Sequence, residues 1–159
     1  MYVYWFVFGL FCFVLKDYKV AGEVIVRDLY ANQASSSYVI IRPGGLSDEP
    51  SEGPTKIATS QGDIFNGEIS REDVSKTTIA ALLSSNVKDA TIELFNKKGY
   101  AKSVKEFPSG YDETKLLHVS GDSYDALLND IYTDSQMTEL FADVVSTYKG
   151  TKVESLDSL

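Results

Sequence analysis

A continuous apolar run at residues 38–41 constrains the fold of this chain more than any other feature. Its sequence is Tyr-Val-Ile-Ile, and an uninterrupted run with β-branched side chains is typical of a strand that is covered on both faces. Residues 42–45, Arg-Pro-Gly-Gly, are expected to stop the strand, because proline cannot donate to a ladder and glycine adopts backbone angles closed to other residues. The run therefore predicts a buried parallel strand.

Segments on both sides of this strand predict further helices and strands. Over residues 16–31, apolar side chains recur every three to five positions between charged ones, which indicates one amphipathic helix. Residues 70–73 predict the start of a second helix, in which the Ser70 hydroxyl accepts a hydrogen bond from the backbone amide of Asp73. Residues 91–95 alternate between polar and apolar side chains and predict another strand. This order of elements indicates a layered α/β domain.

The 159 residues suffice for one compact domain, but charge divides them into three parts. Residues 1–15 hold no charged side chain, and residues 16–110 are nearly neutral. Residues 111–159 hold ten acidic residues against three lysines, and they contain two apolar runs at helical spacing, 127–131 and 137–148. We therefore expect an acidic extension made of a pair of helices.

The apolar segment 1–15 has several interpretations. A membrane-spanning helix needs about 20 apolar residues, whereas this run stops at Lys16. A secretory signal carries basic residues ahead of its apolar stretch, and no Lys or Arg precedes Lys16. The density of aromatic and β-branched residues favours a buried strand, interrupted at Gly9. The strand is the preferred interpretation, and a membrane-associated or targeting segment and an artefactual start of the chain stay open as alternatives.

Composition excludes several classes of function. The formal net charge of −8 repels phosphate backbones, so we expect no nucleic-acid partner. One cysteine, Cys12, and one histidine, His118, supply neither a disulfide nor the ligands of a zinc site, and we expect no bound metal. The acidic residues at 48–52 are interpreted as a surface loop. A soluble intracellular or organellar location is favoured over secretion.

Three motifs follow one another in a characteristic order. They are Lys16-Asp17-Tyr18-Lys19-Val20-Ala21-Gly22-Glu23, then Tyr38-Val39-Ile40-Ile41-Arg42-Pro43-Gly44-Gly45-Leu46, then Gly67-Glu68-Ile69-Ser70-Arg71-Glu72-Asp73-Val74. This order resembles the carboxyl-terminal half of the atypical short-chain dehydrogenase/reductase proteins, and within them the NmrA-like, NAD(P)-binding Rossmann family. That family carries W/Y-K-x-x-x-E on a helix, R-P-G at the end of a strand and I-S-R-x-D-V at a helix start.

The resemblance spans residues 16–95 and implies a fold and a cofactor. The implied fold is a partial Rossmann-like parallel sheet with flanking helices, here followed by the helical carboxyl-terminal extension. The implied cofactor is NAD or NADP, lying across the carboxyl ends of the strands. A dinucleotide-binding unit opens with a glycine-rich turn, and no G-x-G-x-x-G occurs in this chain. The resemblance therefore implies a chain that is shortened at its amino terminus.

The resemblance also implies the residues that touch the cofactor: Lys19, Pro43, Gly44 and Gly45. The family lysine holds the ribose hydroxyls and follows a tyrosine by one helical turn, but the residue four positions before Lys19 is Leu15. No catalytic residue is therefore assigned. The structural alternatives are an exposed Lys19 that pairs with Glu23, and Arg42 paired with a neighbouring acid.

Two functional hypotheses follow. The leading one is an NAD(P)-binding protein that resembles the atypical short-chain dehydrogenases, acting as an oxidoreductase if it turns over at all. The alternative is a non-enzymatic interaction protein, in which the acidic helices of residues 123–148 dock a protein partner. Saturable binding of a dinucleotide separates the two.

Overall fold

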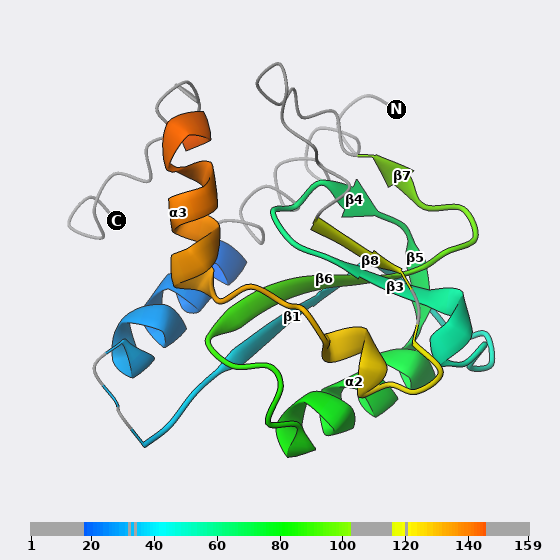
Figure 1. Cartoon of the computed structure of the whole chain (residues 1–159). Coiled ribbons are helices and arrows are strands. Elements are labelled where there is room, and N and C mark those ends of the chain that lie inside the picture. The colour runs from blue at the N-terminus through cyan, green and yellow to red at the C-terminus, as the bar shows by residue number, and fades with distance from the viewer. Residues whose placement is uncertain (1–17, 32, 34, 103–115, 120, 146–159) are drawn as a thin grey trace, which may run out of the picture.

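The structure is a computed structural model of the chain, and it describes residues 18–31, 33, 35–102, 116–119 and 121–145 (Figure 1). The interpretations of segment 1–15 therefore fall outside the described residues, as does the end of the last predicted helix. In the part that is described, no helix combines the length and the apolar character that crossing a membrane requires.

A four-stranded sheet forms the centre of the molecule, in the order β1-β6-β3-β8. Strands β1 (Val39–Pro43) and β6 (Ala90–Asn96) are parallel, which confirms the prediction for both segments. Strands β3 (Ile57–Ser60) and β8 (Leu117–Val119) continue the sheet in antiparallel orientation. The fold is α/β and Rossmann-like, as predicted, and its sheet is mixed.

Two small sheets lie beyond the central one, each made of short strands. Strand β2 (Gly45–Ser47) pairs in parallel with β5 (Glu68–Ser70). Strand β4 (Phe65–Asn66) pairs in antiparallel orientation with β7 (Ala101–Lys102). A short 3-10 helix, η1 (Pro54–Lys56), precedes β3.

Helices cover both faces of the sheet at β1 (Figure 1). A helix over residues 18–30, here called the N-terminal helix, lies on one face together with α3 (Asp134–Val145), and α2 (Arg71–Leu83) lies on the other. Helix α2 starts as predicted, because the backbone amide of Asp73 donates to Ser70 Oγ at 3.0 Å.

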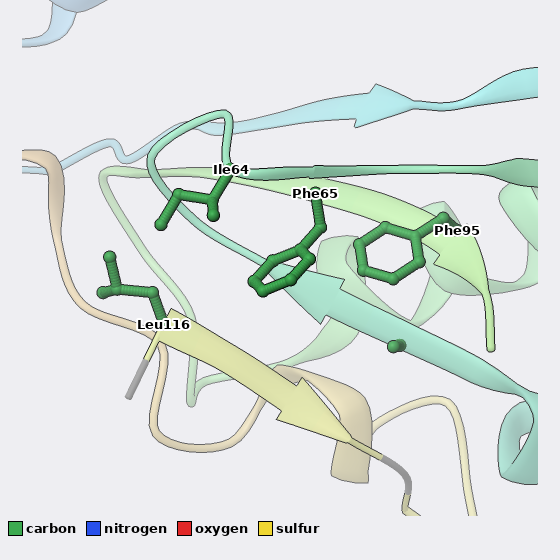
Figure 2. Packing of buried hydrophobic residues seen from close by; sticks show 5 residues of the cluster. Ile64, Phe65, Phe95 and Leu116 are labelled. Carbon is green, nitrogen blue, oxygen red and sulfur yellow. The ribbon is translucent and has the colours of Figure 1, made fainter. Parts of the chain in front are cut away.

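The alternation of β6 divides the core between these two faces. Ala90, Ile92 and Leu94 point toward α2, in two clusters that also contain Val39 and Ile41 of β1. Phe95 points to the opposite face, where it packs with four further apolar residues. Figure 2 shows this cluster, which consists of Ala58, Ile64, Phe65, Phe95 and Leu116. The core is therefore two apolar layers separated by the sheet.

Strand β1 differs from its prediction in burial and in length. The four residues from Val39 to Arg42 are only partly buried, because β6 is the only described strand that pairs with β1. The strand also continues through Pro43 instead of stopping before it. Proline is tolerated there because the amide of Gly44, one residue later, donates to Leu94 O at 2.9 Å and keeps the ladder intact.

The first of the two predicted carboxyl-terminal helices is reduced to one 3-10 turn, η3 (Ala126–Leu128). Leu127 and Leu128 are both buried, and they belong to two different core clusters. A 3-10 turn directs neighbouring side chains about 120° apart, so the two leucines point into different clusters. The second predicted helix is confirmed as α3 within the described residues.

Candidate functional site

An ion pair joins the helix motif to the end of β1. The guanidinium of Arg42 donates from Nε to Glu23 Oε1 at 2.9 Å and from Nη2 to Oε2 at 2.5 Å. Burial alone would raise the pKa of Glu23, but the hydrogen bond and charge of Arg42, with the charge of Arg27, hold it below the usual 4.5. The interpretation that Arg42 pairs with a neighbouring acid is therefore confirmed.

A second set of contacts fixes the direction of the N-terminal helix. Arg27, one turn after Glu23, donates to Thr91 Oγ1 at 2.7 Å and to Asp134 Oδ2 at 2.8 Å. Thr91 lies near the start of β6, whereas Arg42 lies near the end of β1. The helix therefore runs antiparallel to both strands, and its first residues lie toward their carboxyl ends.

This direction places Lys19 at the carboxyl end of β1. Lys19 precedes Glu23 by one turn and is exposed. The expected pair between Lys19 and Glu23 is not formed, because the Glu23 carboxylate is taken by Arg42 and Arg27. Among the described residues, the Lys19 ammonium has no ion-pair partner. It is therefore available to donate to hydroxyl or phosphate oxygens.

The glycines after Pro43 have a structural explanation. The amide of Gly45 donates to Gly67 O at 2.8 Å, and the amide of Gly44 is already used by Leu94. A Cβ atom on Gly44 would lie only 2.0 Å from Gly67 O, so no larger residue fits without a backbone shift. These amides therefore cannot also cradle a phosphate, and Pro43 to Gly45 serve any ligand only as a backbone wall.

Sequence reasoning missed Glu93, which lies at the centre of β6 beside this region. It is the register partner of both Arg42 and Ser60. Its Oε1 lies 3.6 Å from Arg42 Nη1 and its Oε2 accepts a hydrogen bond from Ser60 Oγ at 3.1 Å. Burial raises the pKa of Glu93 to about 7, against the opposing charge of Arg42. The sequence signal that could have found Glu93 is an acidic residue inside the strand predicted at residues 91–95.

Asp73, the acid of the third motif, ties the acidic loop to the domain. Its carboxylate accepts hydrogen bonds from Ser51 Oγ at 2.5 Å, Tyr124 Oη at 2.7 Å, Ser70 Oγ at 2.8 Å and the Glu52 amide at 3.1 Å. Burial acts to raise the pKa of Asp73, but these donors outweigh it and lower the pKa. The motif residue is therefore a structural anchor.

Taken together, the three motifs contribute different things. Glu23, Arg42 and Asp73 hold elements in place, and Lys19 supplies an unpaired cation where β1 ends. Such a cation is suited to the ribose or phosphate groups of a nucleotide.

Comparison with known proteins also indicates a nucleotide ligand. Residues 13–85 match the family model described as NAD(P)H-binding. This match supports the resemblance of the segment to the NmrA-like, NAD(P)-binding family of atypical short-chain dehydrogenases/reductases. The chain is also 41% identical over 80 residues to the uncharacterized sugar epimerase YhfK of Bacillus subtilis (strain 168). That alignment covers 50% of this chain and 35% of YhfK, so the chain spans about a third of its relative's length.

Proposed function

We propose that this chain binds NAD or NADP at the carboxyl ends of β1 and β6. The observation that carries the proposal is the Glu23–Arg42 pair, which orients the N-terminal helix so that Lys19 lies at that edge of the sheet. Ligands of open α/β sheets bind outside the carboxyl ends of the strands. The family of residues 13–85 supplies the class of ligand.

The residues present fit one end of a dinucleotide. Lys19 donates to the ribose hydroxyls nearest the nicotinamide, because its ammonium is exposed and has no competing carboxylate among the described side chains. Pro43 and Gly44 form an uncharged backbone wall beside it. When bound, the cofactor supplies a hydride acceptor or donor. The proposed contacts are therefore the Lys19 ammonium and the uncharged backbone of Pro43 and Gly44.

We further propose that the usual proton transfer does not operate in this chain. The residue one turn before Lys19 is Leu15, which has no proton to donate. Tyr18 is adjacent to Lys19, about 100° away around the helix, so the two side chains leave the helix in different directions. We infer binding without carbonyl reduction by the tyrosine route. The name of YhfK makes a sugar the substrate class to assay beside binding.

The second candidate function is docking of a protein partner by the acidic carboxyl-terminal segment, residues 123–148. One observation favours it: Leu140 of α3 is an exposed apolar residue that follows the acidic Glu139 directly. The start of α3 is anchored to the domain, because Asp134 accepts hydrogen bonds from Arg27 and Tyr38. Such an anchored helix could present Leu140 to a groove on a partner.

Titration with NADPH and NADH, followed by nicotinamide fluorescence and calorimetry, tests the proposal. We expect saturable binding that Lys19→Ala weakens by about tenfold, the value of one hydrogen bond from a charged group. The matched control is Lys88→Ala, because Lys88 is an exposed lysine that precedes β6 and so lies at the opposite end of the strand. Absence of binding at millimolar dinucleotide would reject the proposal and favour the docking hypothesis.

A further inference from the structure

Two lysines lie opposite each other where the ladder between β3 and β6 ends. Ile57 and Asn96 are register partners in this antiparallel pair of strands. One step further along, the amide of Lys97 donates to Lys56 O at 2.8 Å, so these two lysines are the next partners. Side chains in such positions have Cβ atoms about 5 Å apart, and like charges placed there destabilise the sheet. The ladder therefore concentrates two positive charges at its end.

No described carboxylate neutralises this lysine pair. Neither lysine forms an ion pair with a described residue. Glu52, the acid closest to Lys56 in the chain, instead accepts a hydrogen bond from Asn96 Nδ2. Burial and the charge of Lys56 both lower the pKa of Lys97, without an opposing charge from a described acid. The repulsion between the two ammonium groups therefore has no counter-charge in the part of the chain that the structure describes.

Both ammonium groups keep donors free for a ligand. The Lys97 ammonium has three protons and uses one of them, in a hydrogen bond to Thr55 O at 2.7 Å. Lys56 is exposed, and its ammonium donates to none of the described residues. The Lys56 amide donates to Gly53 O at 3.0 Å, and a Cβ atom on Gly53 would meet nothing within 4 Å, so there is open space beside the pair. Two such lysines are suited to the oxygens of one anion.

The position of the lysine pair indicates the size of that anion's carrier. Strand β6 ends at Asn96, so the pair lies at its carboxyl end, the edge at which open α/β sheets bind small molecules. Lys97 follows Leu94, the register partner of Pro43, by three residues, which places its backbone about 10 Å beyond Pro43 along the strand direction. The net charge of −8 repels large polyanions such as nucleic acids. A small anionic molecule therefore fits this edge.

We propose that Lys56 and Lys97 bind a phosphate group carried by a small-molecule ligand at the carboxyl end of β6. The phosphate oxygens accept hydrogen bonds from both ammonium groups, and the negative charge removes the repulsion between them. The site is distinct from the contact proposed for Lys19, and it binds phosphate whether or not a dinucleotide is bound.

Titration of the full chain with inorganic phosphate, at constant ionic strength, tests the proposal through the amide chemical shifts of Lys56 and Lys97. We expect saturable shifts with a Kd of about 1–10 mM, and a loss of affinity of about tenfold in Lys56→Gln. The matched control is Lys88→Gln, because Lys88 is an exposed lysine that precedes the other end of β6. Shifts that do not saturate, or an equal loss in both variants, would overturn the proposal.

Thermal unfolding gives a second readout that a merely structural lysine would not produce. Without phosphate, Lys56→Gln removes the repulsion, so we expect a higher unfolding temperature and a pKa of Lys97 closer to the ordinary 10.5. Phosphate should raise the unfolding temperature of the wild type more than that of Lys56→Gln. Equal increases in the two proteins would refute the proposal.

Repeating the phosphate titration with saturating NADH or NADPH identifies the carrier of the phosphate. Unchanged affinity for phosphate assigns the lysine pair to a separate phosphorylated ligand, and competition assigns it to the phosphates of the dinucleotide. Both results uphold the site. If no dinucleotide binds, the function proposed above fails while the phosphate titration still decides this inference.

Discussion

Arg42 binds both carboxylate oxygens of Glu23, at 2.9 and 2.5 Å, and thereby joins two motifs that are 19 positions apart in the chain. Bidentate pairs of this kind add directional specificity to the attraction between the charges. Here the geometry fixes the N-terminal helix against β1 and determines where Lys19 lies. Glu23 and Arg42 therefore serve to place Lys19, whose ammonium has no ion-pair partner among the described residues.

Glu23→Ala is expected to destabilise the domain by about 1–2 kcal/mol, since it leaves the partly buried Arg42 guanidinium without its main acceptor. Urea unfolding at pH 7 measures the change. Glu68→Ala is the matched control, because Glu68 is an exposed acid of β5 for which no ion pair is formed among the described residues. Equal effects of the two substitutions would show that the pair does not orient the helix.

Two glycine substitutions are expected to act in opposite directions. Gly44→Ala puts a Cβ atom against Gly67 O and should cost about 1–3 kcal/mol of stability. Gly22→Ala, within the N-terminal helix, meets no atom within 4 Å and should stabilise by about 0.5–1 kcal/mol through helix propensity. Thermal unfolding of both variants checks the contrast. A neutral Gly44→Ala variant would contradict the close approach.

Glu93 is expected to make stability fall as the pH rises. Its folded pKa of about 7 lies above the ordinary 4.5, so protonated Glu93 stabilises the fold fully below about pH 4.5, and this contribution is lost as the pH rises through about 7. Glu93→Gln should therefore match the wild type near pH 5 and exceed it at pH 8, by on the order of 2 kcal/mol. Urea unfolding at both pH values measures it, and parallel pH profiles would disprove the assignment.

Asp73 is expected to have the opposite effect on stability, which should fall as the pH is lowered. Its folded pKa is lowered from 3.8, so its hydrogen bonds stabilise the fold above about pH 4 and are lost as the pH falls through the lowered folded pKa. Asp73→Asn should destabilise at pH 7 and flatten the acid limb of the stability profile. Ser75→Ala, at an exposed hydroxyl of the same helix, is the control. An unchanged acid limb in Asp73→Asn would exclude Asp73 as its source.

Local signals in the sequence predicted local structure well. The Ser70 cap on Asp73, the strand at residues 91–95 and the parallel direction of β1 each depend on a few neighbouring residues, and the structure confirms them. The partner of Arg42 could be predicted only as a nearby acid. Which acid it is depends on the packing of the helix on the sheet.

Long-range contacts explain what the sequence did not predict. The spacing of Lys19 and Glu23 fits a helical pair, but Arg42, from another element, takes the carboxylate with better geometry. The segment before Asn129 has helical spacing. Leu127 and Leu128 are nevertheless both buried in the core, and the segment forms only one 3-10 turn. In each case tertiary packing overrides a local preference.

The hydrogen bond from Thr59 Oγ1 to Leu127 O, at 3.1 Å, spans 68 positions of the chain. Leu127 and Leu128 complete the two apolar clusters beneath the sheet, so both clusters stay open until this late segment has been synthesised. A chain growing on the ribosome therefore leaves the undersides of β3 and β6 incompletely covered until Leu127 and Leu128 have been added. Contacts this distant slow folding, and a nascent chain of this kind gives chaperones a long interval in which to bind.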